Sequence, residues 1–171
     1  MKDSRQHAFT LIELSIVVVV IALIVAGVVA GQSLVHQAKI RSVINEVSIY
    51  RTAYTTFRLQ HEAIAGDFEK ATTFFSGTNT ANGDGNNKID TSSGMNSNTE
   101  GLQFFYHLQE AKLLPLALTG VIGTGIEVNK NVPQSAYSNK SVYWIYGQNL
   151  WDRYPAGNSI VVSGEIGDGW G

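Results

Sequence analysis

One uninterrupted apolar segment near the amino terminus restricts what this chain can fold into. The 23 residues from Phe9 to Gly31 carry a single charge, that of Glu13. As a helix, the segment would reach about 35 Å, which is enough to cross a hydrocarbon layer of about 30 Å. The sequence therefore predicts a membrane-spanning helix, although the mean hydropathy of the whole chain is close to zero.

The charges that flank this segment predict its orientation. Lys2 and Arg5 precede it against one acid, Asp3, whereas the first residues beyond Gly31 are nearly neutral. Because basic flanks stay on the cytoplasmic side, we expect a cytoplasmic amino terminus. The 140 residues after Gly31 would then be exported.

The helical pattern continues beyond Gly31, which argues against a cleaved secretory signal peptide. Apolar residues recur at intervals of four, three, four and three, at Val43, Val47, Tyr50, Tyr54 and Phe57. Four basic residues lie off this stripe: Lys39, Arg41, Arg51 and Arg58. We expect one helix from Phe9 to near Ala65, ended by Gly66, whose second half packs one face on a globular core.

Composition excludes several kinds of function. The chain has 171 residues, 12 Lys and Arg against 14 Asp and Glu, and no cysteine. The missing cysteines exclude disulfides, thiolate metal sites and a cysteine nucleophile, and the slight negative charge argues against nucleic acid. No catalytic motif surrounds His7, His36, His61 or His107, and Gly120–Gly125 has the wrong glycine order for a dinucleotide loop. We therefore expect no enzyme.

Glu13 is the informative residue of the apolar segment. A carboxylate in a membrane helix costs about 2–3 kcal/mol, so it requires a partner or a position at the headgroups. The run Ala8-Phe9-Thr10-Leu11-Ile12-Glu13-Leu14 closely resembles the amino-terminal signal of type IV pilins and type II secretion pseudopilins. The family usually has Gly where this chain has Ala8.

This resemblance implies a processing and assembly route. A prepilin peptidase would cut between Ala8 and Phe9 and methylate the new amine of Phe9. Glu13 would then pair with the Phe9 amine of a neighbouring subunit during filament assembly. Removal of residues 1–8 would leave 10 basic and 13 acidic side chains, a net charge of −3.

The resemblance also implies an α+β, pilin-like fold, in which a long amino-terminal helix packs on a small antiparallel β-sheet. The expected parts are a leader (1–8), a membrane and filament half of the helix (9–35) and an exported domain (36–171). Its partners would be other pilin or pseudopilin subunits, prepilin peptidase, an inner-membrane assembly platform and lipid. The protein would lie in the inner membrane before assembly and in a periplasmic or cell-surface filament afterwards. An uncleaved, signal-anchored binding module and an exported enzyme stay open as alternatives.

Small residues on the apolar segment favour close helix packing. Gly27 and Gly31 form a GxxxG pattern, and alanines at 22, 26 and 30 form a second row at the same spacing. We expect these faces to contact other helices.

A polar segment in the exported domain contains candidate ligands for calcium. Residues 76–101 are rich in Asn and Gly, and within them Asp84, Asn86 and Asp90 offer hard oxygens at alternate positions. Similar pseudopilins hold calcium in a loop of this domain, so the resemblance supports this interpretation. The alternative is a plain solvent-exposed loop.

The rest of the domain predicts two helices and three strands. A short helix over 67–75 would bury Phe68, Phe74 and Phe75, and a second, Glu100–Leu114, would end at Pro115 with His107 hydrogen-bonded in the core. Strands are expected at 126–129, 142–146 and 160–163. Aromatic residues at 142–146, with Trp151 and Tyr154, would pack against the long helix and neighbouring subunits.

Overall fold

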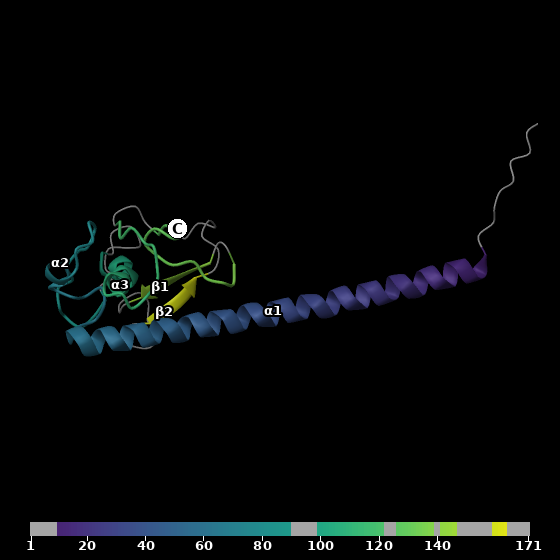
Figure 1. Cartoon of the computed structure of the whole chain (residues 1–171), viewed down its shortest axis with the longest axis horizontal. Helices are drawn as coiled ribbons and strands as arrows, with labels where there is room; N and C mark the ends of the chain where they lie inside the picture. The colour runs from purple at the N-terminus through teal and green to yellow at the C-terminus, as the bar shows by residue number, and fades with distance from the viewer. Residues whose placement is uncertain (1–9, 90–98, 122–125, 139–140, 147–158, 164–171) are drawn as a thin grey trace, which may run out of the picture. The chain divides into compact units, whose positions relative to one another are not determined.

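The computed structural model describes residues 10–89, 99–121, 126–138, 141–146 and 159–163 (Figure 1). The helices are α1 (Leu11–His61), α2 (Ala71–Phe74) and α3 (Thr99–Glu110), and the strands are β1 (Val142–Tyr146) and β2 (Ser159–Ser163). The chain divides into two compact parts between Arg41 and Ser42.

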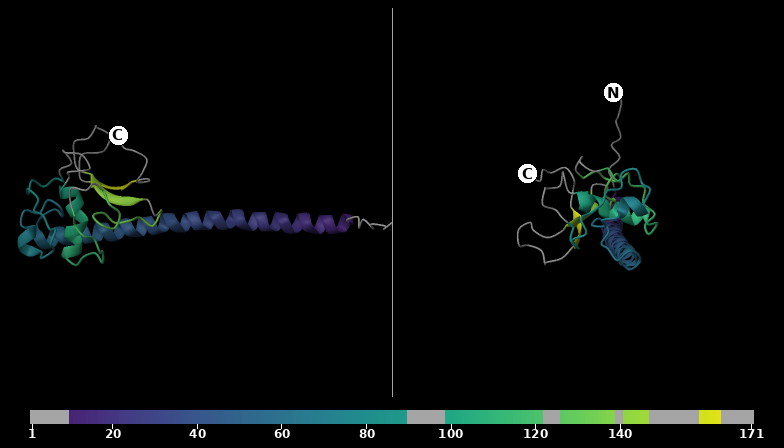
Figure 2. Two further views of the ribbon diagram at one scale, coloured as in Figure 1. Left: turned by 90° about the horizontal axis from the view of Figure 1, so that it is seen from above. Right: turned by 90° about the vertical axis from the view of Figure 1, so that its left-hand side faces the viewer.

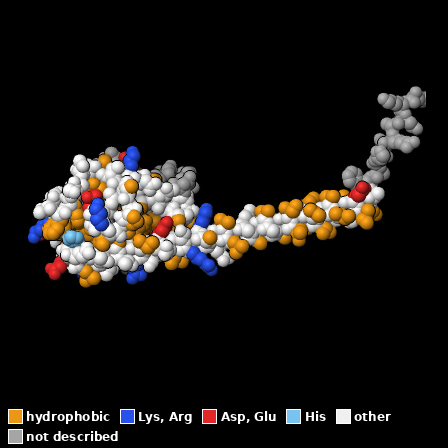
Figure 3. Space-filling model, viewed as in Figure 1, with side chains coloured by type: hydrophobic (Ala, Val, Ile, Leu, Met, Phe, Trp, Pro, Cys, Tyr) orange, Lys and Arg blue, Asp and Glu red, His pale blue; other side chains and the backbone are white. Residues whose placement is uncertain are grey.

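The first part of α1 is apolar on every side. Among the described residues, α1 is the one helix long and apolar enough to cross a membrane, judged by length and composition. None of the residues in its most apolar stretch is buried within the structure, and hydrophobic side chains run along its surface (Figure 3). Phe9, where we expected the helix to begin, lies outside the described residues. A helix that exposes apolar side chains all round requires lipid or other helices around it.

The end of α1 differs from the prediction. The helix ends at His61, and Glu62 has a φ of 52°, the left-handed conformation that often follows a helix. Gly66 does not end the helix, so that prediction is wrong. Its φ is 92°, and a Cβ atom there would lie 2.4 Å from the carbonyl oxygen of Glu100. Glycine is therefore required at Gly66 because the backbone in the first turn of α3 approaches it closely.

The apolar stripe of α1 builds the core of the second part, as predicted. Tyr50 and Phe57 are buried. The other positions of the stripe pack partly buried against the same core: Val43, Val47 and Tyr54. The ring of Tyr50 lies edge-on to Phe105 of α3 at 5.3 Å and to Tyr143 of β1 at 5.0 Å. One face of α1 thus holds both a helix and a strand by aromatic packing.

A carboxylate of α1 fixes the position of β1. Glu46 Oε2 accepts hydrogen bonds from the Tyr143 hydroxyl at 2.6 Å and from the Ala136 amide at 3.1 Å. Burial, together with Glu46, raises the pKa of the Tyr143 hydroxyl, because a phenolate there would face a carboxylate. The contact joins residues 97 apart in the sequence, a separation that no local pattern can indicate.

The short helix after α1 is smaller than predicted. Of the expected 67–75, only Ala71–Phe74 is helical. Phe68 and Phe75 are buried as predicted, but Phe74 is 61% exposed, so its assignment to the core is wrong. Ala71 and Phe75 lie four residues apart and share the buried face, which leaves Phe74 turned toward solvent.

The polar segment after α2 is held by α3. The side chain of Gln103 donates to the carbonyl groups of Asn79 at 3.0 Å and Gly120 at 2.9 Å, and accepts from the amide of Ala81 at 3.1 Å. Ile89 is fully buried. The described residues of this segment therefore lie on the domain instead of extending from it.

Helix α3 ends earlier than predicted. It stops at Glu110, and Lys112 has a φ of 60°, so the chain turns before it reaches Pro115. The amides of Leu113 and Leu114 both donate to the carbonyl of Leu108, which closes the helix end. Four apolar residues of α3 are buried: Leu102, Phe104, Phe105 and Leu108.

Two of the three predicted strands are present. β1 and β2 pair antiparallel, and Figure 2 shows the two strands side by side. Their register places Trp144 opposite Val161. The strand predicted at 126–129 is not formed. The amide of Glu127 donates to Asn131 Oδ1 at 2.8 Å, and its carbonyl accepts from the Asn131 amide at 3.1 Å. Because these bonds turn the chain back on itself, Val128 makes only an isolated bridge with Val132.

His107 is a hydrogen-bonded core residue, as predicted. It is fully buried in α3, its Nδ1 accepts from the Gly66 amide at 2.9 Å, and its Nε2 lies 2.9 Å from the Ala81 carbonyl. These two partners require a neutral ring with the proton on Nε2. Burial lowers the pKa of His107 to about 4.

We therefore expect acid to destabilise the domain through His107. In the unfolded chain, His107 binds a proton at the ordinary pKa of 6.5, whereas in the folded domain it does so only near pH 4. The unfolded state therefore binds more protons between these two values, and the free energy of unfolding decreases as the pH falls through this interval. The free energy of unfolding should fall by about 3 kcal/mol over this interval. Thermal unfolding of the full chain in detergent, from pH 7 to pH 4, should show a steeper loss than in His107→Gln, which cannot titrate. If the stability of the two proteins fell equally with pH, His107 would not be the group responsible.

Candidate functional site

The charged residue of the apolar segment lies in the first turn of α1 and bonds to the residue before the helix. Glu13 Oε2 accepts from the backbone amide of Thr10 at 2.8 Å and from its hydroxyl at 2.7 Å. The amide of Glu13 donates to Thr10 Oγ1 at 3.3 Å. This reciprocal pattern is a capping box. The carboxylate is thus supplied with two donors by its own chain.

The capping role of Thr10 is not among the predictions made from the sequence. The signal was present as Thr10-Leu11-Ile12-Glu13, the T-x-x-E spacing of a capping box before an apolar run. In apolar surroundings, each of these hydrogen bonds offsets part of the free-energy cost of removing the carboxylate from water. Ala8 and Phe9, the predicted cleavage site, lie outside the described residues.

The glycines of the apolar segment have no packing role within their own chain. A Cβ atom added at Gly27 or Gly31 would meet no other atom within 4 Å. Small residues four apart allow a second helix to approach closely. Their contact with other helices stays a prediction.

Two of the predicted calcium ligands are hydrogen-bonded to each other. Asp84 accepts from the backbone and side-chain nitrogens of Asn86 at 3.0 and 2.8 Å, and Asn86 Oδ1 accepts from the amide of Lys88 at 2.8 Å. Asn86 thus donates to Asp84, and its part in a calcium site stays a prediction. Asp90 lies outside the described residues.

Asp84 instead meets two buried carboxylates. The carboxylate oxygens of Asp67, Asp84 and Glu100 lie within 4.8 Å of one another. Burial raises the pKa of Asp67, and the neighbouring Asp84 raises it further. The Gly85 amide, which donates to Asp67 Oδ1 at 2.7 Å, lowers the pKa of Asp67 in part. Calcium takes about six to eight oxygens, of which this cluster supplies only some. Calcium binding stays a prediction.

The aromatic strand packs inward where its side chains are described. Val142, Tyr143 and Ile145 are buried. The side chains of Trp144, Tyr146, Trp151 and Tyr154 lie outside the described residues.

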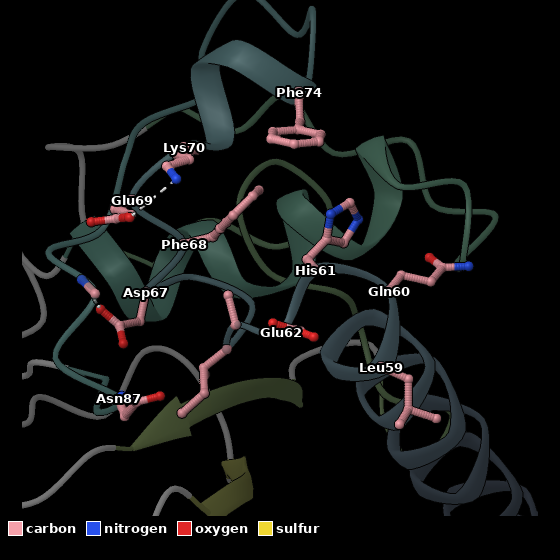
Figure 4. A pocket seen from close by; sticks show the side chains of 13 residues that line it. Leu59, Gln60, His61, Glu62, Asp67, Phe68, Glu69, Lys70, Phe74 and Asn87 are labelled. Carbon is pink, nitrogen blue, oxygen red and sulfur yellow. Dashed lines mark hydrogen bonds and ion pairs between the residues drawn. The ribbon is translucent and has the colours of Figure 1, made fainter.

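A pocket of about 490 Å³, which we name the α1-end pocket, opens where α1 ends (Figure 4). Its lining includes three rings and three carboxylates: those of His61, Phe68, Phe74, Glu62, Asp67 and Glu69. Burial lowers the pKa of His61, which favours the neutral ring. Lys70 also lines the pocket, and its Nζ forms an ion pair with Glu69 Oε1 at 3.8 Å. The lining is therefore acidic and aromatic.

Comparison with known proteins identifies the amino-terminal segment. Residues 3–29 match the family model described as Prokaryotic N-terminal methylation motif. This is the prepilin-type cleavage and methylation motif of type IV pilins and pseudopilins, which confirms the resemblance stated above. No curated protein and no solved structure matches the chain. The chain is thus prepilin-like, and proteins of this kind are typically non-enzymatic and structural.

The capping box leads to a prediction about the first turn of α1. Thr10→Ala removes the hydroxyl that accepts from the Glu13 amide, so we expect this turn to lose about 1 kcal/mol. Hydrogen exchange of the full chain in detergent micelles should show faster exchange of the Glu13 amide. Thr10→Ser keeps the hydroxyl and should exchange like the wild type. Equal protection in the alanine variant would show that the hydroxyl does not stabilise the turn.

Proposed function

We propose that the chain is a structural subunit of a type IV pilus or a type II secretion pseudopilus. The observation that carries the proposal is a single charge, Glu13, at the start of an apolar helix that bears the prepilin-type motif. The subunit polymerises by packing of the long helices and catalyses no reaction itself.

Processing prepares the amino terminus for assembly. Prepilin peptidase hydrolyses the peptide bond between Ala8 and Phe9 on the cytoplasmic face and methylates the new amine. The cut turns a neutral amide into an amine that is largely protonated at neutral pH, since an α-amino group has a pKa of about 8. Cleavage therefore creates the positive charge that Glu13 lacks within its own helix.

Assembly brings that charge to a carboxylate. Glu13 of one subunit pairs with the Phe9 amine of its neighbour, because the two charges neutralise each other in lipid and either alone would be costly. Before assembly, Thr10 provides neutral donors to the same carboxylate oxygen. The bonds from Thr10 leave the carboxylate charged, whereas the neighbour's ammonium both donates a hydrogen bond and neutralises the charge, so it competes well with Thr10. The pair also fixes the stagger between subunits.

The remainder of the apolar helix supports filament packing. Its exposed apolar side chains need lipid or other helices around them. Gly27 and Gly31 leave room for the backbone of a second helix to approach closely. Lipid covers the helix before assembly, and the helices of other pilin or pseudopilin subunits cover it afterwards.

These steps place the protein in the inner membrane with a cytoplasmic amino terminus, and then in a periplasmic or cell-surface filament. An inner-membrane platform would extract the processed subunit. The apolar helix that carries the prepilin motif is consistent with membrane anchoring before assembly.

Substitution of Glu13 tests the proposal. Glu13→Gln keeps an oxygen that can accept from Thr10 but removes the charge, whereas Glu13→Ala removes both. We expect both variants to insert into the membrane and both to be depleted from the sheared filament fraction, measured by immunoblot against the membrane fraction. Because Gln preserves the capping bonds, normal filament incorporation of Glu13→Gln would contradict the charge pairing.

A further inference from the structure

Two basic residues, Lys39 and Arg41, follow the most apolar stretch of α1. No Asp or Glu stands between Glu13 and Glu46, so the sequence offers no acid beside them. Both side chains are exposed. Neither belongs to an ion pair among the residues that the structure describes. The two charges therefore require a partner from outside the chain.

The two basic side chains point to opposite sides of α1. Successive residues of an α-helix are about 100° apart around its axis, so Lys39 and Arg41 are about 200° apart. Figure 3 shows Lys and Arg side chains on both sides of the helix in this region. A protein surface that packs on one side of α1 reaches only one of the two. A partner for both must surround the helix.

The spacing along α1 matches the thickness of a bilayer. Glu13 and Lys39 are 26 residues apart, which is about 39 Å along a helix. A bilayer measures about 40–45 Å when its headgroups are included. With Glu13 near the cytoplasmic headgroups, Lys39 and Arg41 lie at the headgroups of the opposite leaflet.

The residues just before the basic pair suit the same level of the membrane. Leu34 is 67% exposed and Val35 is 58% exposed. They stand among uncharged polar residues: Gln32, Ser33 and Gln37. Long basic side chains in such a stretch keep their stems on apolar surface and extend their charged ends to the headgroups.

We propose that Lys39 and Arg41 bind phosphate groups of anionic lipids in the exported-side leaflet, one on each side of α1. Headgroups surround a membrane helix on every side, so each cation meets a phosphate. A guanidinium group binds phosphate through two hydrogen bonds, and an ammonium group binds it as a point charge. These contacts set the depth and tilt of the subunit before assembly. The inference rests on the membrane anchoring that the proposed function includes.

Lipid selectivity tests the proposal directly. The full chain would be reconstituted in phosphatidylcholine vesicles with a trace of spin-labelled phosphatidylglycerol or spin-labelled phosphatidylcholine. Electron spin resonance then measures how much labelled lipid the protein immobilises. We expect the wild type to prefer phosphatidylglycerol, and Lys39→Gln with Arg41→Gln to lower this preference several-fold. Each single substitution should give part of the loss, because the two residues contact different lipids.

The matched control is Arg51→Gln with Arg58→Gln. It removes the same charge from exposed positions of α1. These positions lie about 15 Å or more beyond Arg41 along the helix, which exceeds the screening length of about 8 Å at physiological salt. The control should therefore keep the preference of the wild type.

Three results would overturn the proposal. One is an equal preference in the wild type and in the Lys39→Gln, Arg41→Gln variant. Another is an equal loss in the control, which would show a general response to net charge. The third is a loss in only one of the single variants, which would contradict contacts on both sides. Because the subunit is unassembled in these vesicles, a chain that shows the preference but forms no filament would contradict only the proposed function.

The depth of α1 gives an independent readout. A fluorophore on Ala38→Cys, in a chain that has no other cysteine, would be quenched by nitroxides carried on lipid headgroups or on acyl chains. In vesicles that contain phosphatidylglycerol, we expect quenching mainly by the headgroup nitroxide. Adding Lys39→Gln and Arg41→Gln should shift quenching toward the acyl-chain nitroxide, because the helix then slides deeper. An unchanged ratio would contradict a role of the pair in setting the depth.

Discussion

A carboxylate in an apolar helix has to be matched by donors wherever the helix lies. In the subunit, Thr10 supplies an amide and a hydroxyl to Glu13, so the first turn of α1 is closed without a partner. These donors carry no charge and leave the carboxylate negative. In the proposed filament, the Phe9 amine supplies the missing positive charge. In this proposal, the same residue stabilises the start of the helix and selects how subunits join.

The long helix has to suit two surroundings with one continuous backbone. Its first residues are apolar all round, as lipid or other helices require, whereas beyond Arg41 a single stripe is buried by Phe105 and Tyr143. Glu46 adds a polar bond to that packing. Because one element serves both purposes, cleavage near Gly31 would separate its apolar part from the part that packs in the core.

Local patterns in the sequence predicted much of this architecture. The interval of the apolar stripe identified the buried face of α1, and short runs rich in β-branched and aromatic residues, separated by turn residues, identified β1 and β2. Errors arose where particular contacts, some local and some between distant residues, decide the outcome instead of the apolar pattern. Gly66 is required by the backbone of Glu100 and not by the helix end, and the bonds of Glu127 to Asn131 turn a segment that reads as a strand. At the site, Glu13 and the motif were evident, and the Thr10 capping box could have been read from its spacing.

The most direct test of this account is the mass of the amino-terminal peptide of the protein purified from assembled filaments or from the membrane. The account predicts a peptide that begins at Phe9 and carries one added methyl group on its amine, with residues 1–8 removed. A chain that begins at Met1, or one cut near Gly31, would lack the paired charge on which filament assembly depends, and would contradict the account.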